Sequence, residues 1–182
     1  MAGDPTSALI RVRSARPGDA AAIAAVYAPY VTEGVVSFEL DPPDAAEMAR
    51  RMAAGGTRHP WLVAEWGGKV RGYAYASAFR ARAAYDRAVE TTVYVATDAQ
   101  GRGVGRALYE ALLARLTEFG FTQAVAIIAL PNNASVRLHE RLGFMLIGVN
   151  PAVGYKHGRW IDVGMWQRAL AVPDDPPRPI PV

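Results

Sequence analysis

Hydrophobic and polar residues alternate along Glu90–Val95 with the period of a β-strand. The alternation predicts Glu90, Thr92 and Tyr94 on one face of this strand and Thr91, Val93 and Val95 on the other. From residue 104 onward the apolar positions follow the spacing of a helix instead, at Val104, Leu108, Leu112, Leu116 and Phe119. Between the two elements lies a glycine-rich turn, Gln100–Gly105. The sequence therefore predicts a strand, a tight turn and a helix in direct succession.

The same pattern divides the rest of the chain into further strands and helices. Strands are predicted at Leu9–Ala15, Pro60–Trp66, Lys69–Ser77, Gln123–Leu130, Phe144–Val149 and Trp160–Gln167. Helices are predicted from Pro17 to Tyr30, over Asp44–Ala54 and over Asn133–Leu142. Gly67-Gly68 predicts a hairpin turn, and Gly154–Arg159 is expected to be a loop between the last two strands. The order β-αα-βββ-α-β-α-ββ predicts an α/β (α+β) fold, with helices on both faces of a mixed, mostly antiparallel sheet of about seven strands.

Composition limits the class of protein. The 182 residues suit one domain over residues 1–172, with a loose leader at 1–7 and a Pro-rich tail at 173–182. The absence of cysteine excludes disulfides, thiolate catalysis and cysteine-ligated metals, and His59, His139 and His157 lack the spacing of metal ligands. A net charge of +3 without a basic cluster argues against nucleic-acid binding. No apolar run approaches a membrane span and no export signal opens the chain, so we expect a cytoplasmic protein.

The glycine-rich turn is typical of a phosphate-binding loop. Backbone N–H groups at a helix start lie at the positive end of the helix dipole, and glycine lets an anion approach them closely. The dinucleotide fingerprint G-x-G-x-x-G does not fit, because the glycines fall at 101, 103 and 105, and the G-K-[ST] of a Walker A loop is missing. Gln100–Gly105 does fit Q-x-x-G-x-G, the pyrophosphate loop of GNAT-type N-acetyltransferases, which bind acetyl-CoA. The turn alone leaves an unliganded surface loop as the alternative.

Other stretches of the chain resemble phosphinothricin N-acetyltransferases and their relatives that acetylate methionine sulfoximine. They are Pro60–Glu65, Ala83–Asp86, Glu90–Val95, Leu130–Asn132, Ser135–Glu140, Gly154–Gly158, Asp162–Gly164 and Trp166-Gln167, in family order. The resemblance implies the GNAT acyl-CoA N-acyltransferase fold and a homodimer. It also implies direct transfer of an acetyl group from acetyl-CoA to the α-amino group of phosphinothricin, methionine sulfoximine, methionine sulfone or another small amino acid.

Glu90 is the candidate general base for this reaction. The ammonium group of an amino acid is mostly charged at neutral pH, so a base must remove a proton before the nitrogen can react. A carboxylate in the cleft of a central strand has its pKa raised by desolvation, toward the value that a base needs. The alternative is an ordinary salt bridge between Glu90 and Arg82 or Arg87.

His139 is the second candidate catalytic residue. On its predicted helix it shares a face with Asn132 and Ser135. Many GNAT enzymes have a tyrosine at this position that protonates the departing thiolate, whereas the phosphinothricin subgroup resembles this chain in having histidine. His139 is therefore an acid, a second base or a hydrogen-bonded structural residue, and the sequence leaves the three roles open.

The resemblance also assigns the contacts to acetyl-CoA. The backbone of Val93, Tyr94 and Val95 would run beside the pantetheine, with an N–H group, that of Val95, at the thioester oxygen. The pyrophosphate would contact Gln100, Gly101, Arg102, Gly103, Val104, Gly105 and Arg106. Leu130, Asn132 and Ser135 complete this set, with Asn132 at the pantetheine amides. Arg102 and Arg106 could equally be solvated surface charges.

Cationic and phenolic side chains suit a substrate with an α-carboxylate and a strongly polar γ-group. Arg82 and Tyr85 match the family's positions before the catalytic strand, and Phe38 matches an aromatic residue on an early loop. Thr92 completes the predicted substrate site. The usual Trp-Lys pair before the arginine is replaced by Phe79-Arg80. Lys156 and His157 either line the site across the dimer or belong to a turn.

Two other functions remain open. A GNAT enzyme acting on another amine, on a protein N-terminus or on lysine would need an open groove with acidic groups, whereas the loop from Arg82 to Tyr85 favours a small anion. A non-catalytic CoA-binding sensor would tolerate the loss of Glu90 and His139, and both are present. Aminoglycosides are polycations that need an acidic cleft, which a net basic chain does not predict.

Overall fold

A single sheet of seven strands organises the computed structural model, which describes residues 9–172. The strands are β1 (Arg11–Ser14), β2 (Trp61–Trp66), β3 (Lys69–Ala78), β4 (Ala88–Val95), β5 (Gln123–Leu130), β6 (Met145–Lys156) and β7 (Arg159–Ala169). Their order across the sheet is β1-β2-β3-β4-β5-β7-β6, and β4 and β5 form the parallel pair. The predicted mixed, mostly antiparallel sheet is confirmed. The predicted leader and tail, 1–7 and 173–182, lie outside the described residues.

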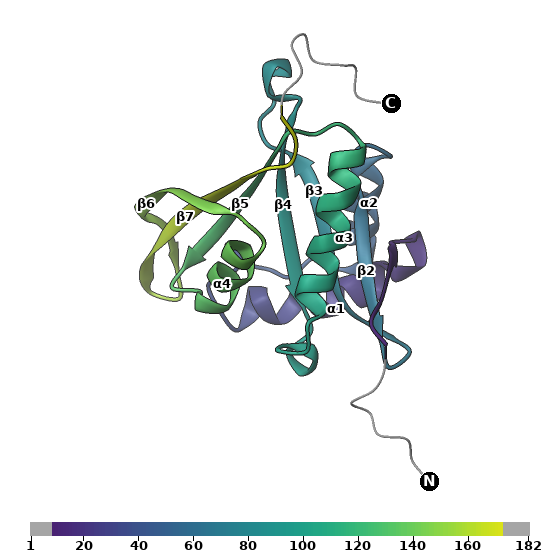
Figure 1. The fold of residues 1–182 in the computed structure, drawn as a ribbon. Helices are drawn as coiled ribbons and strands as arrows, with labels where there is room; N and C mark the ends of the chain where they lie inside the picture. Colours follow the sequence, from purple (N-terminus) through teal and green to yellow (C-terminus); the bar gives the residue numbers. More distant parts are fainter. Residues whose placement is uncertain (1–8, 173–182) are drawn as a thin grey trace.

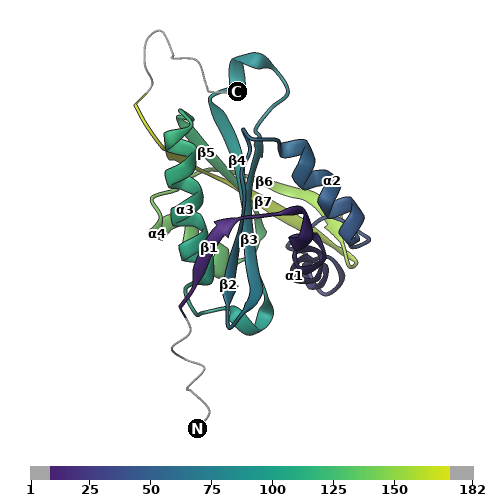
Figure 2. The same ribbon diagram turned by 90° about the vertical axis from the view of Figure 1, so that its right-hand side faces the viewer.

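Helices cover both faces of this sheet, as predicted (Figures 1 and 2). Figure 2 shows α1 (Ala20–Thr32) and α2 (Ala45–Gly55) on one face, with α3 (Val104–Glu118) and α4 (Asn133–Arg141) on the other. Short 3-10 turns are η2 (Pro17–Asp19), η3 (Ala83–Tyr85) and η4 (Thr97–Ala99). The predicted apolar stripe of α3 packs on the sheet, with Leu108, Leu112 and Leu116 fully buried. Within residues 9–172 every helix is too short or too polar to cross a bilayer.

The prediction of a loop over Gly154–Arg159 is wrong. Strands β6 and β7 continue to Lys156 and from Arg159, and the turn between them consists of His157 and Gly158 alone, with φ of 49° and 74°. A two-residue turn with positive φ at both positions matches the twist of the flanking strands. The alternation that marks a strand is hidden in β6, because its pairing with β7 shifts register twice.

Strands β4 and β5 pair only at their first three residues. The pairs are Ala88–Gln123, Val89–Ala124 and Glu90–Val125. Beyond Glu90, β4 stays paired with β3 as far as Val95, and β5 stays paired with β7 as far as Leu130. Figure 1 shows the two strands diverging toward the end of the sheet where α3 begins. Glu90 therefore occupies the last paired position before the sheet divides.

Candidate active site

A small cavity of about 50 Å³ lies where β4 and β5 separate. It is lined by Thr91–Tyr94 of β4, by Ile127–Ala129 of β5, by Asn132, Ser135 and His139 of the α4 region, and by Val36 and Tyr109. The structure thus brings the predicted cofactor residues Val93 and Tyr94 to the same place as Asn132 and Ser135, some 40 residues later in the chain. The predicted cofactor residues Val95 and Leu130 do not line this cavity.

The backbone of β4 offers hydrogen-bonding groups to this cavity. The Ala96 N–H donates to Arg71 O of β3 over 2.8 Å, and alternate residues of a strand point their backbone groups to opposite sides. The backbone groups of Val93 and Val95 therefore point away from β3. Val95 O accepts a hydrogen bond from the Tyr30 hydroxyl over 2.6 Å. The Val95 N–H donates to the oxygen of the Tyr30 hydroxyl over 3.4 Å. Val93 lines the cavity, and its backbone groups point to the same side of β4 as those of Val95.

Glu90 lies on the other face of β4 from the core around α3. Tyr94, on the same face as Glu90, packs edge-on against Tyr27 of α1, whereas Val93 and Val95 pack in the α3 core, so the predicted alternation is confirmed. The Glu90 carboxylate is half-buried, and no ion pair joins it to Arg82 or Arg87 within residues 9–172. Burial raises the pKa of Glu90, and the positive charge of Arg80 offsets part of that rise. Glu90 is an uncommitted carboxylate suited to accept a proton.

His139 is buried in a chain of polar contacts. Its Nδ1 lies 2.8 Å from Ser135 O and its Nε2 lies 2.9 Å from the Tyr109 hydroxyl. The Tyr109 hydroxyl lies 3.1 Å from Thr91 O. Burial lowers the pKa of His139, which favours a neutral ring with the proton on Nδ1, donated to Ser135 O. Nε2 then accepts from Tyr109, the contact that links α4 to α3.

Two tyrosines of the site were missed by the sequence analysis. Tyr109 has no exposed surface and follows Leu108 in the apolar stripe of α3. A tyrosine in a leucine stripe is a usable signal, since a buried phenol normally finds a hydrogen-bond partner. Tyr30 joins Val95 to Gln100, whose Nε2 lies 3.1 Å from its hydroxyl. No local pattern relates residue 30 to residues 95 and 100.

The glycine-rich turn has the form of an anion-binding site at the start of α3. Gly101 and Gly103 have φ of 72° and 85°, the left-handed region that favours glycine, and α3 begins without a side-chain cap. The Arg102 guanidinium lies over the Trp66 ring at 4.9 Å from its centroid, and Arg106 pairs with Glu110 at 2.7 Å on the surface. The backbone N–H groups are therefore the fixed part of this site, and the two cations lie around it.

The predicted substrate residues, apart from Thr92, do not line the small cavity. Arg82 and Tyr85 are exposed on the loop between β3 and β4, with Tyr85 edge-on to Phe79 at a centroid distance of 5.9 Å. Phe38 lies between α1 and α2 and packs over Gly154 of β6. Lys156 is buried and binds backbone oxygens, whereas His157 is a turn residue.

A second cavity, of about 500 Å³, lies between α2 and strands β2 and β3 on the face of Glu90. Tyr75 and Ser77 line it, and Ser77 is the cross-strand neighbour of Glu90. The face that carries the candidate base therefore has free volume beside it.

Known proteins resemble this chain over most of its length. The acetyltransferase (GNAT) domain family matches residues 12–166. The phosphinothricin N-acetyltransferase of Streptomyces viridochromogenes is 44% identical over 94% of this chain and 93% of that protein. The L-methionine sulfoximine/L-methionine sulfone acetyltransferase of Pseudomonas aeruginosa is 37% identical over 93% of this chain and 98% of that protein.

The fold is also similar to that of a solved structure. The crystal structure of a GNAT superfamily phosphinothricin acetyltransferase from Sinorhizobium meliloti in complex with acetyl-CoA matches with a TM-score of 0.85 and 42% identity, covering 88% of each chain. Because the family match spans most of the chain and the fold agrees, the chain belongs to the GNAT family of acetyl-CoA-dependent N-acetyltransferases.

Proposed function

We propose that this protein transfers the acetyl group of acetyl-CoA directly to the α-amino group of a small, strongly polar amino acid, with Glu90 as the general base. Phosphinothricin, methionine sulfoximine and methionine sulfone are the proposed substrates. The observation that carries the proposal is the position of Glu90, an unpaired carboxylate at the point where β4 and β5 separate. The names of the relatives support the substrate class.

The residues present fit acetyl-CoA. The uncapped start of α3 supplies N–H groups for a pyrophosphate, from Gly101 to Arg106, with Gln100 beside it. Val93 has backbone groups that point away from β3, where a pantetheine amide can take the place of a strand. Asn132 Oδ1 accepts from Ser135 N over 3.1 Å, which leaves its Nδ2 donors for a ligand. Acetyl-CoA supplies the acetyl group as a thioester.

Each proton of the reaction has a place. Glu90 takes the proton that the substrate's ammonium group must lose. We assign the N–H that holds the thioester oxygen to Val93 rather than to Val95, because Val93 lines the cavity and the Val95 N–H is directed at the Tyr30 hydroxyl. Tyr109 lines the cavity, and burial raises the pKa of its phenol, so it is protonated before the reaction. Its O–H, which donates to His139 Nε2 at rest, would turn to the leaving sulfur. The phenolate would regain a proton from the acylated nitrogen, which must lose one more proton to become an amide. His139 then acts by holding Tyr109.

The experiment that tests the function measures thiol release from acetyl-CoA in the presence of phosphinothricin, methionine sulfoximine, methionine sulfone or a lysine peptide. We expect turnover with the first three, because Arg80, Arg82 and Tyr85 offer cations and a phenol near the β4 end that carries Glu90. Turnover with the peptide alone would overturn the proposed substrate class. Acetyl-CoA binding with no turnover would overturn the proposed activity.

A Gly103→Ala variant is expected to weaken acetyl-CoA binding by about tenfold or more, because alanine is strained at φ of 85° and the loop must change shape. Gly120, at the other end of α3, has the same φ and makes Gly120→Ala the matched control. Both variants should lose similar stability, while calorimetric titration shows weaker acetyl-CoA binding only for Gly103→Ala. Equal affinities in the two variants would remove the turn from the binding site.

A homodimer is part of the proposal, and β6 and β7 provide its surface. They expose the apolar residues Met145, Leu146, Ile147, Val149, Val153, Tyr155 and Trp160. Monomers seldom expose so many neighbouring apolar side chains. Sedimentation analysis should give twice the mass of one chain, and Trp160→Glu should give monomers, whereas Leu9→Glu, an exposed leucine elsewhere, should not.

We place the enzyme in the cytoplasm, beside its acetyl-CoA supply.

A further inference from the structure

Lys156 is a buried cation that the proposed chemistry does not use. Its side chain comes from the end of β6 and only 5% of the residue is exposed. Its Nζ donates to Val31 O over 2.6 Å and to Ser37 O over 2.8 Å. Val31 belongs to the last turn of α1, whose carbonyl oxygens carry the negative end of the helix dipole. Within residues 9–172 no carboxylate forms an ion pair with Lys156, so the ammonium is held by backbone oxygens.

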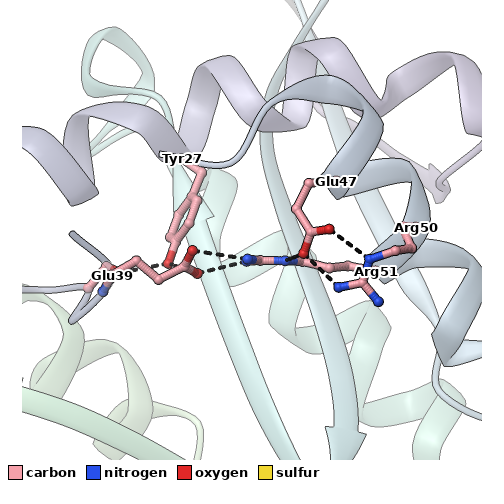
Figure 3. A network of polar contacts seen from close by, with 6 residues as sticks. Tyr27, Glu39, Glu47, Arg50 and Arg51 are labelled. Atoms are coloured by element: carbon pink, nitrogen blue, oxygen red, sulfur yellow. Dashed lines mark hydrogen bonds and ion pairs between the residues drawn. The ribbon is translucent and has the colours of Figure 1, made fainter. Parts of the chain in front are cut away.

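The two residues on either side of Phe38 are fixed by contacts with three elements. Ser37 is held at its carbonyl by Lys156 and at its Oγ by the Tyr27 hydroxyl, 2.6 Å away. Glu39 accepts from the Tyr27 hydroxyl over 2.9 Å and from both terminal nitrogens of Arg51 over 2.7 and 3.0 Å (Figure 3).

Arg51 is itself anchored, because its Nε donates to Glu47 Oε1 over 2.7 Å on the same helix. Figure 3 shows this chain of contacts running from α1 through the loop to α2. Phe38 therefore lies between two residues whose positions are fixed by hydrogen bonds and an ion pair. These contacts restrict the backbone of the loop at residue 38.

The Phe38 ring packs against Gly154 of β6. A Cβ placed on Gly154 would overlap the ring, so the absence of a side chain there gives the ring its place. Gly154 is two residues before Lys156 on the same strand. The end of β6 thus supplies both the backbone surface under Phe38, at Gly154, and the cation that binds the loop containing Phe38, at Lys156. The ring remains 43% exposed, and Val36, two residues before it, lines the cavity between β4 and β5.

We propose that Lys156 is a positioning residue that fixes Phe38 as a wall of the acceptor site, and so sets the affinity for the amino-acid substrate. The inference rests on the proposed function, because it assumes that the acceptor amine reaches Glu90 beside this loop. Lys156 touches neither substrate in this scheme and acts through the loop. Burying an ammonium on two carbonyls costs free energy, so a gain in fold stability does not account for its presence.

The test compares Lys156→Met with Lys69→Met, the chain's other lysine, which is exposed on β3. Amide hydrogen exchange of residues 33–41 should be faster in Lys156→Met and unchanged in Lys69→Met. For the acceptor that the wild type uses best, KM should rise about tenfold in Lys156→Met, with kcat and acetyl-CoA affinity within about twofold. A purely structural role would lower the active fraction and leave KM unchanged.

Two further variants make the result decisive. Gly154→Ala displaces the Phe38 ring with Lys156 intact and should raise the acceptor KM in the same way, even if Lys156→Met fails to fold. In a Phe38→Ala background, Lys156→Met should add less than about twofold to KM, because the ring it positions is already gone.

The inference would be overturned if Lys156→Met left amide exchange in residues 33–41 unchanged. It would also be overturned if exchange became faster but the acceptor KM did not change. A wild type that acetylates none of the tested amines would overturn the proposed function instead. In that case the exchange experiment alone decides the inference, and unchanged exchange in both Lys156→Met and Gly154→Ala overturns it.

Discussion

A Glu90→Gln variant is expected to lose at least about 100-fold in kcat at neutral pH, because glutamine cannot accept the proton that the substrate's ammonium group must lose. Its affinity for acetyl-CoA should stay within about twofold, since the carboxylate faces away from the α3 core and contacts none of the predicted pyrophosphate loop. Steady-state kinetics and calorimetric titration measure the two effects separately. Glu118→Gln, a change of an exposed glutamate at the end of α3, is the matched control. Near-wild-type turnover across the pH range would remove Glu90 from the mechanism.

The pH dependence follows from the raised pKa of Glu90. The base works only when ionised, so kcat/KM of the wild type should fall as the pH drops through a value above the ordinary range of glutamate. The contribution of Glu90 to the free energy of unfolding changes with pH in the opposite direction from kcat/KM. Because the folded protein favours the protonated carboxyl, the stability that this preference supplies at low pH is lost as the pH rises through the folded pKa. Glu90→Gln should therefore be no less stable than the wild type at pH 7, which thermal denaturation can check.

A Tyr109→Phe variant is expected to lose about 10- to 100-fold in kcat with acetyl-CoA affinity little changed, because the cavity loses its phenolic donor. It should also lose about 1–3 kcal/mol of unfolding free energy, since the buried His139 Nε2 loses its hydrogen-bond donor. Thr117→Val, which removes the hydroxyl of an exposed residue of α3, is the control. Loss of stability with full turnover would leave the His139–Tyr109 pair with a structural role only.

The arrangement of the elements could be predicted because it depends on local periodicity. The stripe of α3 and the alternation of β4 are short-range patterns, and the structure confirms both. The Gly67-Gly68 hairpin was also predicted, since two glycines permit the tight turn between β2 and β3. Strand β6 was predicted too short because its shifted register, near Pro151 and Gly154, breaks the alternation on which strand prediction depends.

The site was predictable only in part. Glu90, His139 and the glycine-rich turn could be proposed from the sequence because each lies in a recognisable local motif. The partners that hold them were not, because they come from distant parts of the chain: Tyr30 reaches Val95 across 65 residues and Lys156 reaches Val31 across 125. The choice between Val93 and Val95 as the N–H donor also depends on three-dimensional detail, since it rests on which residue a tyrosine from α1 already occupies.

The separation of β4 from β5 leaves an unpaired strand edge inside the protein, and unpaired edges are where other polypeptide chains add to a sheet and start aggregation. A strand that added there would need to lie about 4.8 Å from β4 along several residues, with its own side chains projecting on both faces. The available space is about 50 Å³ and is bounded by Val36, Tyr109 and His139. The side chains of Val36, Tyr109 and His139 lie where the side chains of an added strand would project. They therefore hinder β-sheet association with a neighbouring chain at this edge.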